Sequence, residues 1–405
     1  MAENKEKKVL NVPNLRFPEF EGEWEEERLS DIADLSKGIG ISKDQLSADG
    51  EPCILYGELY TKYKSETIKE VISKTNIDNT KLVKSKANDV IIPCSGETAE
   101  EIATARCVLK DDVLLGGDLN IIRLHGYDGS FMSYQLNGKR KYDIAKVAQG
   151  VSVVHLYGEH LKNIKTINPG LNEQKKIANL LSLLDERIAT QNKIIEDLKK
   201  LKYAISKYLF ERKDLFENKI KLSKVAELKN GYAFQSSKYN ALGKWKILTI
   251  ANVAGERYVK TNECNSIIEI PYDIQKHQKL EANDILISLT GNVGRVSLCT
   301  EGFFLLNQRV GLLQLKISEN REFIYQVLSF HKFEESMIAC AQGAAQMNIG
   351  KGDVENYILP YSFNKENINS VASVLKNYDK YIINEINMLS MLHSQKQYLL
   401  RQMFI

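Results

Sequence analysis

A ladder of apolar positions, spaced alternately by four and three residues, occurs twice in this chain of 405 residues. The first copy starts at Ile177 and the second at Val371, 194 residues later. In each copy eight of ten positions are apolar, and the two polar interruptions fall at equivalent steps. Because this spacing keeps one apolar stripe on one face of an α-helix, each copy predicts a long helix with a coiled-coil seam. The predicted seam comprises Ile177, Leu181, Leu184, Ile188, Gln191, Ile195, Leu198 and Lys202 in the first helix, and Val371, Leu375, Tyr378, Ile382, Glu385, Leu389, Leu392 and Lys396 in the second.

The similarity between the two halves extends beyond these helices. Residues 29–33 (LSDIA) match 222–226 (LSKVA), and residues 87–90 (ANDV) match 282–285 (ANDI). The offsets are 193 and 195 residues, close to that of the helices. A nearly constant offset indicates two homologous units that differ by loop insertions. The chain is therefore interpreted as a tandem duplication, and the weak similarity between the anchors suits one scaffold with two different recognition surfaces.

The polar interruptions favour an antiparallel pairing of the two helices. In an antiparallel pair Gln191 can face Lys396, and Lys202 can face Glu385. A parallel pair in register would instead place Lys202 against Lys396, which is a like-charge contact in a partly dry seam. The halves are then expected to be related by a pseudo-twofold axis through the helix pair.

Turn signals and periodicity divide the chain into five segments. They are a leader (1–17), a first mixed domain (18–171), a first long helix (172–212) with Asn172 as its N-cap, a second mixed domain (215–361) and a second long helix (364–405). Strands are expected at 89–93, 119–124, 247–250, 284–289 and 310–315, and shorter helices at 142–148 and 321–330. The predicted fold class is α+β (mixed α/β): two tandem homologous domains separated by two long helices that pair as an antiparallel coiled coil.

Composition excludes several classes of protein. With 43% hydrophobic and 26% charged residues, the chain is typical of a globular protein. A net charge of +3 gives no argument for nucleic-acid binding by the whole chain, so any basic surface must be local. Six scattered cysteines without a C-x-x-C predict neither a disulfide framework nor a zinc site. The sequence has neither the apolar run of a membrane span nor a signal peptide, so a cytoplasmic location is expected.

The usual motifs of covalent chemistry are missing from the sequence. The segment 350–352 (GKG) lacks the spaced glycine and the hydroxyl residue of a phosphate loop. The segment 155–160 (HLYGEH) has one residue too many between its first histidine and its glutamate for a zinc-protease motif. No G-x-S-x-G elbow is present. The sequence therefore predicts a binding protein, with no catalytic residues and no metal site.

Three stretches carry a resemblance to a known family. They are 172–177 (NEQKKI) with the helix that follows, 15–24 (LRFPEFEGEW), and 284–294 (DILISLTGNVG) with its two glycines. Over nearly its full length the chain resembles the specificity subunit of a type I DNA restriction–modification enzyme. The first domain departs from the family pattern, because 89–96 (DVIIPCSG) is not followed by a second glycine at the matching place.

The resemblance implies a division of labour among subunits. Each mixed domain would be a target recognition domain that reads one half of a bipartite target in double-stranded DNA. The helix pair would set the spacer and dock two adenine methyltransferase subunits. The family's cofactors would belong to the partners: S-adenosylmethionine to the methylating subunits, and ATP and magnesium to the restriction (endonuclease and translocase) subunits. No cofactor is expected in this chain, and no membrane partner.

Candidate DNA-binding residues follow from base chemistry. Arginine and lysine suit guanine, asparagine and glutamine suit adenine, and small or apolar groups suit the thymine methyl. Loops that combine such residues with aromatic side chains are the predicted contacts. They contain Tyr56, Tyr60, Lys62, Tyr63, Lys64, Ser95, Glu97, Thr98 and Arg106 in the first domain, and Tyr232, Phe234, Gln235, Arg257, Tyr258, Thr290, Asn292, Arg295, Gln308 and Arg309 in the second.

A different class of protein also accounts for the duplication. A non-catalytic coiled-coil adaptor for protein–protein assembly would have the same two domains and the same helix pair. It would need no polar-tipped basic loops and would show no salt-dependent affinity for DNA.

Overall fold

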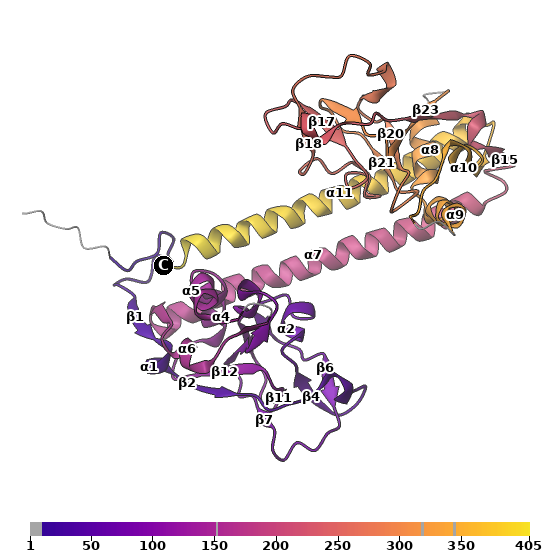
Figure 1. Cartoon of the computed structure of the whole chain (residues 1–405). Coiled ribbons are helices and arrows are strands. Elements are labelled where there is room, and N and C mark those ends of the chain that lie inside the picture. Colours follow the sequence, from indigo (N-terminus) through magenta and orange to yellow (C-terminus); the bar gives the residue numbers. More distant parts are fainter. Residues whose placement is uncertain (1–9, 151–152, 317–319, 343–345) are drawn as a thin grey trace, which may run out of the picture. The chain divides into compact units, whose positions relative to one another are not determined.

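The computed structural model describes residues 10–150, 153–316, 320–342 and 346–405 (Figure 1). The chain divides into two compact units. The first unit consists of Met1–Asn192 together with Asn387–Ile405, and the second of Lys193–Ile386. Residues 1–9 of the expected leader lie outside the described residues. Each unit contains one mixed domain and a part of both long helices.

Two five-stranded sheets form the domain of the first unit, with strand orders β2-β12-β8-β10-β5 and β3-β6-β4-β11-β7. A separate short sheet pairs β1 with β14, and another pairs β9 with β13. The strands are β1 (Glu25–Arg28), β2 (Ala33–Lys37), β3 (Leu46–Ser47), β4 (Glu51–Ile54), β5 (Thr67–Ile68), β6 (Ser73–Thr75), β7 (Val83–Lys84), β8 (Asp89–Pro93), β9 (Ser95–Gly96), β10 (Arg106–Val108), β11 (Leu114–Leu115), β12 (Leu119–Leu124), β13 (Val154–His155) and β14 (Lys165–Asn168). The helices are α1 (Leu29–Ile32), η1 (Lys43–Gln45), α2 (Glu58–Thr61), α3 (Ala99–Ile102), α4 (Gly129–Asn137), α5 (Lys141–Val147) and α6 (Gly158–Lys162).

Two four-stranded sheets form the domain of the second unit, with strand orders β16-β23-β20-β21 and β18-β17-β22-β19. Strands β15 and β24 pair separately. The strands are β15 (Asn218–Lys221), β16 (Ala226–Asn230), β17 (Trp245–Leu248), β18 (Asn265–Ile267), β19 (Lys279–Leu280), β20 (Ile285–Ser288), β21 (Val296–Leu298), β22 (Phe304–Leu306), β23 (Val310–Leu315) and β24 (Ile358–Tyr361). The helices are η2 (Leu222–Lys224), η3 (Ser236–Lys238), η4 (Lys276–Gln278), α8 (Arg321–Leu328), α9 (His331–Ala341) and α10 (Lys351–Glu355).

The two domains share one topology, because each sheet of the second has its counterpart in the first. Strand β8 corresponds to β20, and both lie between antiparallel neighbours. Successive side chains of a strand point to opposite faces of its sheet. Val90 and Ile91 of β8 therefore enter two different hydrophobic cores, and Ile285 and Leu286 of β20 do the same. The predicted fold class, two tandem mixed domains with a long helix between them, is confirmed.

In each domain a glycine brings two backbone segments close together at an equivalent position. Gly38 follows β2 and Gly231 follows β16. A Cβ at Gly38 would lie 2.0 Å from the carbonyl oxygen of Gly116, and one at Gly231 would lie 2.1 Å from that of Asn307. Only glycine fits at such a distance. The duplicated glycines are therefore explained by packing of the backbone.

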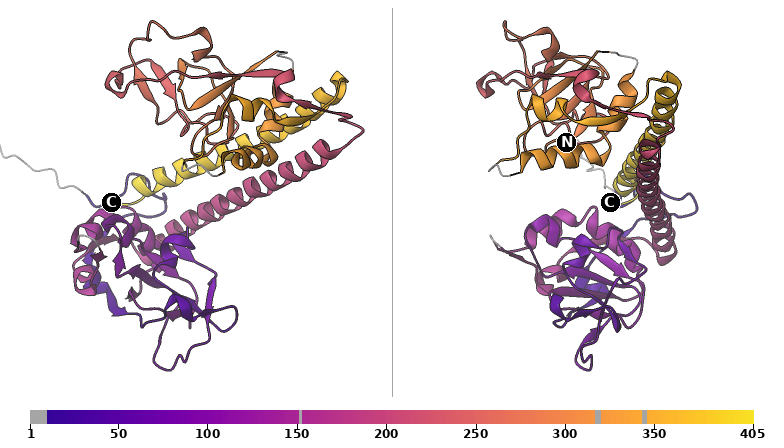
Figure 2. Two further views of the ribbon diagram at one scale, coloured as in Figure 1. Left: turned by 45° about the vertical axis from the view of Figure 1, so that its right-hand side comes forward. Right: turned by 90° about the vertical axis from the view of Figure 1, so that its right-hand side faces the viewer.

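The long helices are α7 (Leu171–Glu211) and α11 (Lys365–Gln402). In the first unit Leu181 of α7 shares a core with Leu399 and Met403 of α11, and both views of Figure 2 show these helix ends side by side. In the second unit Leu209 packs on a core that includes Val371. The first unit also pairs Asp185 with Lys396, and the second pairs Lys202 with Asp379. Within each unit, rising numbers on α7 therefore meet falling numbers on α11, so the helices pack antiparallel there. Every predicted seam residue is described, and none is exposed.

The two seam lysines bond to residues other than the expected ones. Lys202 Nζ donates to Asp379 Oδ1 at 2.6 Å, where Glu385 was expected. Lys396 Nζ lies 2.6 Å from both Glu66 and Asp185, where Gln191 was expected. The expectation considered only residues at seam positions. The observed carboxylates come from positions beside the seam and from the first domain.

The start of α7 also differs from the expectation. The carbonyl oxygen of Gly170 accepts bonds from the backbone N–H groups of Glu173 and Gln174, at 3.0 and 3.1 Å. Gly170 is therefore the residue that accepts the first helical bond, and Asn172 lies inside the first turn. The prediction of Asn172 as N-cap was wrong. Among the described residues, no helix is long and apolar enough to cross a membrane.

The leader is tied to both long helices inside the first unit. The N–H of Leu15 donates to the carbonyl of Gln402 at 2.9 Å. The Arg16 guanidinium forks onto the carboxylate of Glu173, with both N–O distances at 2.8 Å. Bidentate pairs of this kind fix orientation as well as contributing energy. Two of the sequence stretches that carry the family resemblance thus contact each other.

Candidate nucleic-acid interface

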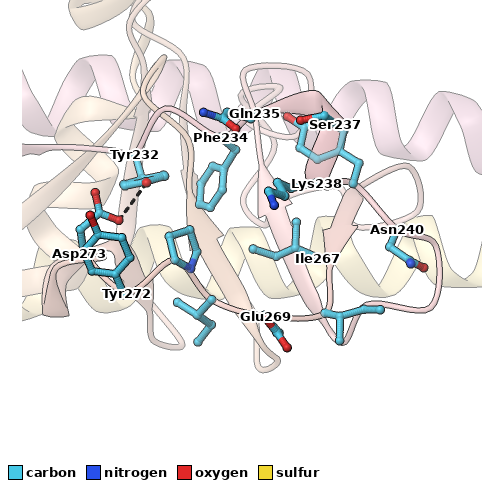
Figure 3. A pocket seen from close by; sticks show the side chains of 14 residues that line it. Tyr232, Phe234, Gln235, Ser237, Lys238, Asn240, Ile267, Glu269, Tyr272 and Asp273 are labelled. Carbon is cyan, nitrogen blue, oxygen red and sulfur yellow. Dashed lines mark hydrogen bonds between the residues drawn. The ribbon is translucent and has the colours of Figure 1, made fainter.

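Three of the predicted contact residues in the second domain line one open cavity of about 720 Å³ (Figure 3). They are Tyr232, Phe234 and Gln235, on the segment between β16 and η3. The rings of Tyr232 and Phe234 lie 4.9 Å apart between centroids. The opposite wall is the segment after β18, which contributes the fully exposed Tyr272 and also Asp273. Two loops far apart in the sequence therefore form one concave, aromatic surface.

The position of this cavity follows from the local backbone. Gly231 brings the chain against the end of β22, and Tyr232 then forms a β-bridge with Asn307. The Tyr232 hydroxyl donates to Asp273 at 2.9 Å. That hydrogen bond raises the pKa of Tyr232, because Asp273 holds the proton on the hydroxyl. This hydrogen bond thus joins the two walls of the cavity.

The cavity carries groups that recognise nucleobases. The exposed amide of Gln235 presents a donor and an acceptor, which is the pattern that adenine requires. Asn240 is also exposed; its Oδ1 accepts from the N–H of Leu242 at 2.9 Å, and its amide N–H groups complete the pattern. Lys238 adds a cation for guanine or phosphate. The ring of Tyr272 offers a flat apolar face to a base or a thymine methyl. Sequence reasoning missed Lys238, Asn240 and Tyr272, although the mixed polar and aromatic run 236–240 (SSKYN) was a signal for the first two.

A second group of predicted residues lies on the loop between β20 and β21. Gly291 and Gly294 have φ angles of +74° and +79°, a left-handed conformation that glycine adopts readily because it has no Cβ. The loop is tied to the segment before α10, because Thr290 Oγ1 donates to Asn348 at 3.0 Å. Asn292 is exposed at its tip, and Arg295 Nε lies 3.4 Å from Glu334. The loop is thus held by side-chain contacts on both sides of its exposed Asn292.

Three further predicted residues of the second domain lie in two places. Gln308 and Arg309 are exposed at the start of β23, next to the bridge between Tyr232 and Asn307. Tyr258 is exposed and bridges Leu298 of β21. Gln308 and Arg309 are therefore close in sequence to the cavity wall, whereas Tyr258 lies on a different strand edge.

The first domain replaces the glycine loop with a helical turn. Ser95 and Gly96 form β9, and Thr98 caps α3 by accepting from the N–H of Glu101 at 3.2 Å. The Tyr60 hydroxyl of α2 donates to the carbonyl of Ser95 at 3.4 Å. Helix α2 and the β9–α3 loop therefore contact each other. The departure from the family pattern in this loop accompanies a different local structure.

Most of the other predicted residues of the first domain surround α2. Tyr56 and Glu97 are exposed, and Lys64 Nζ donates to the Tyr60 carbonyl at 3.1 Å. Lys62 bonds to Glu58 and Ser73, both at 2.7 Å, so it holds α2 against β6. The exposed part of this surface is thus the outer side of α2 and the tip of the β9–α3 loop.

Three predicted contact residues are covered by protein atoms. Tyr63 is buried in a core that also contains Leu59 of α2. Arg106 donates to the carbonyls of Tyr63 and Ala105, and burial lowers the pKa of its guanidinium. Arg257 forks onto Glu322 at 2.6 and 2.8 Å and also bonds to Asp379 at 2.8 Å. In this structure the two guanidinium groups donate to protein acceptors, and the Tyr63 hydroxyl accepts from the backbone N–H of Ile72 at 3.2 Å.

The second domain also has a basic cavity whose residues were not predicted from the sequence. It has a volume of about 510 Å³ and lies beside β16, β19 and β23. Its basic lining residues are Lys229, Lys276, His277, Lys279 and Arg321, and its acidic ones are Glu281 and Asp284. The run 276–279 (KHQK) was the available signal. Such a surface suits phosphate groups, whose contacts position a nucleic acid without reading its bases.

Comparison with known proteins places the duplication in a family. The model of the type I restriction modification DNA specificity domain matches residues 21–200 and again residues 216–388. The chain is 27% identical over 406 residues to the type I restriction enzyme MjaVIII specificity subunit of Methanocaldococcus jannaschii, covering 93% of this chain and 90% of the relative. It is 24% identical to the putative MjaX specificity subunit of the same organism, covering 93% and 91%.

Solved structures share the fold. The type I restriction–modification S subunit from M. genitalium matches with a TM-score of 0.63 at 18% identity, covering 97% of this chain and 99% of that one. A chain from a study of complex assembly and conformational transition in a type I system matches with a TM-score of 0.53 at 15% identity, covering 93% and 96%. Because the family model matches both halves, the chain belongs to the type I restriction modification DNA specificity family and is a specificity subunit of such a system.

Proposed function

We propose that each mixed domain reads one half of a bipartite DNA target. The proposal rests on one observation: the two domains have the same sheet topology, but the loops between their strands differ. The first domain has the single-turn helices α2 and α3 where the second has a glycine loop and the open cavity around Gln235. A shared scaffold with different contact groups suits two half-sites of different sequence. The alternative, a coiled-coil adaptor for protein–protein assembly, does not explain why the loops of the two domains diverge.

In the second domain the proposed reading surface is the cavity. Gln235 and Asn240 would pair with adenine, Lys238 with guanine or a phosphate, and Tyr272 would pack on an exposed base or methyl. The basic cavity with Lys276 would hold phosphates. In the first domain the proposed surface is the outer side of α2 with Tyr56, and the tip of the β9–α3 loop.

The long helices are proposed to set the spacer between half-sites and to dock the adenine methyltransferase subunits. Apolar side chains that the seam does not use support the docking role: Leu183, Ile194 and Leu201 on α7, and Ile386, Met388 and Met391 on α11, are all at least 40% exposed. The chain would itself carry no catalysis. S-adenosylmethionine would bind to the methylating partners, and ATP with magnesium to the restriction partners.

A domain exchange tests the proposal. Residues 215–361 are replaced by the second domain of a diverged specificity subunit, and methylated adenines are mapped in DNA from cells that express the chain with its methylating partner. We expect one half of the methylated motif to change and the other to stay the same. An exchange of residues 18–171 should change the opposite half. A motif in which both halves change after either exchange would contradict independent reading.

A further inference from the structure

The first unit contains a buried charge cluster at the junction of domain, α7 and α11. Asp185 of α7 accepts hydrogen bonds from Ser65 Oγ at 3.0 Å and from the Tyr134 hydroxyl at 2.7 Å. Lys396 of α11 lies 2.6 Å from Asp185 Oδ1 and 2.6 Å from Glu66 Oε2. The side chains of Lys396, Asp185 and Glu66 are 14%, 8% and 11% exposed. The cluster thus joins the domain to both helices.

The second unit contains a cluster of the same design. Asp379 of α11 accepts from Lys202 of α7 at 2.6 Å, from Arg257 at 2.8 Å and from Gln326 at 2.6 Å. Arg257 also forks onto Glu322. Three elements meet here as well, because Arg257 and Gln326 belong to the domain.

The two clusters are products of the duplication. Asp185 and Asp379 are 194 residues apart, and so are Lys202 and Lys396. In the first unit α7 supplies the aspartate and α11 the lysine, and in the second unit the helices exchange these roles. A cation also lies over an aromatic ring in each: Lys396 Nζ is 5.6 Å from the ring centre of Tyr134, and Arg257 is 5.0 Å from that of Tyr325. The aspartate, the lysine and a domain tyrosine thus recur, whereas the other domain groups differ: Glu66 and Ser65 in the first cluster, Arg257 and Gln326 in the second.

Stability alone gives little reason for such clusters. Removing charges from water costs about as much as their pairing returns, so a buried ion pair is often no more stable than an apolar replacement. Its distinct property is direction, because charged hydrogen bonds hold donors and acceptors at fixed angles. An apolar seam has no such directionality. The clusters are therefore suited to fix one orientation of each domain on the helices.

We infer that Asp185 and Asp379, each with the opposite helix's lysine, are positioning residues that fix how each domain is set on the helices. They thereby fix the spacer length at which both half-sites are methylated. This inference rests on the proposed reading of two half-sites. It assigns spacer discrimination to residues that contact no DNA.

The test uses the full chain in complex with its adenine-methylating partners. DNA duplexes carry the mapped target with its native spacer or with a spacer one base pair longer or shorter. The main variant combines Glu66→Gln, Asp185→Asn and Lys396→Met, which removes the charges of these three side chains while keeping their volume and an acceptor for Tyr134. The nearby Arg106 guanidinium, which interacts with both carboxylates, keeps its charge and its bonds to the carbonyls of Tyr63 and Ala105. We expect the melting temperature to change by a few degrees and the preference for the native spacer to fall roughly tenfold, since small misplacements alter rates on that scale.

Two matched variants accompany it. Lys69→Met with Glu186→Gln removes an exposed ion pair between the same domain and α7, next in sequence to Asp185. It should leave the spacer preference unchanged, because exposed pairs contribute little. Lys396→Arg keeps the cation and should retain most of the preference. In all variants the half-site bases should be unchanged.

The outcomes separate the inference from the proposed function. If the neutral cluster keeps full spacer preference, or if it unfolds the complex, the cluster is not a positioning device. If the exposed-pair variant relaxes the spacer equally, the effect is not specific to the cluster and the inference fails. If the unaltered complex shows no bipartite target, the proposed function itself fails, and this is established before any variant is examined.

Discussion

Glu66 is a carboxylate held almost out of water at the junction of the first domain with the helices. Burial raises its pKa above the ordinary value of 4.5, although Lys396 opposes this. The folded chain therefore takes up this proton at a higher pH than the unfolded chain. The ionised form costs stability at neutral pH, and the cost disappears as pH falls through the raised pKa.

Glu66→Gln should remove this pH dependence. The difference between the melting temperature of the variant and that of wild type should be largest, in favour of the variant, near pH 7. It should become smaller as the pH falls toward 4.5. Thermal melts of both proteins across this range, at constant ionic strength, measure the difference. A difference that rises toward acid pH would contradict the burial of an ionised Glu66.

Gln235 is an exposed amide on the cavity wall of the second domain. If it reads a base, Gln235→Ala should reduce discrimination at one position of one half-site by about 1–3 kcal/mol, the range for a bidentate pair. Methylation rates on targets substituted at each position measure this. Gln395→Ala, at an exposed glutamine of α11, is the control and should leave discrimination intact. Both variants should melt like wild type.

Residue types were easier to predict than their surroundings. The sequence favoured Tyr232, Phe234 and Gln235 together, and they do lie together, because they are neighbours in the chain. The sequence also placed Arg257 among the candidate DNA-binding residues, but only because of its residue type. Its partners, Glu322 and Asp379, are distant in sequence and could not be inferred from a local pattern.

At the scale of elements, the β20–β21 loop depends on its glycines. A Cβ on Gly294 would lie 2.7 Å from Cβ of Met337, in a backbone with φ of +79°. Gly294→Ala should therefore destabilise the second unit by about 1–3 kcal/mol. Urea unfolding measures the loss. Gly352→Ala is the matched control, since nothing lies within 4 Å of its Cβ and it is in helix α10, where alanine should be neutral or stabilising.

Elements were predictable where one local signal was strong. Strands β8, β12 and β23 have the expected bounds, because each is a nearly continuous buried apolar run. Helices α2 and α3 were not predicted, since a single turn has too few residues for a helical period. Strand pairing was also beyond the sequence, because most partners, such as β8 and β12, are distant in the chain.

At the scale of the whole molecule, a net charge of +3 leads us to expect that DNA affinity depends on local cations, and the basic cavity is their proposed location. Binding of the assembled complex should weaken with salt, with a slope of log K against log salt of about −0.9 per phosphate neutralised. Replacing Lys276 and Lys279 by glutamine should make the slope shallower by about 2 if both contact phosphate. Binding titrations at several salt concentrations measure this slope. An unchanged slope would show that the cavity does not contact DNA phosphates.

The first unit is built from both ends of the chain, whereas the second is one continuous stretch. During synthesis on the ribosome, the second unit has all of its residues once Ile386 has emerged. The first unit must wait for the last residues, because Leu399 and Met403 complete the core around Leu181. The domain made first is therefore finished last, and a chain that loses its final turns would leave that apolar surface open to aggregation.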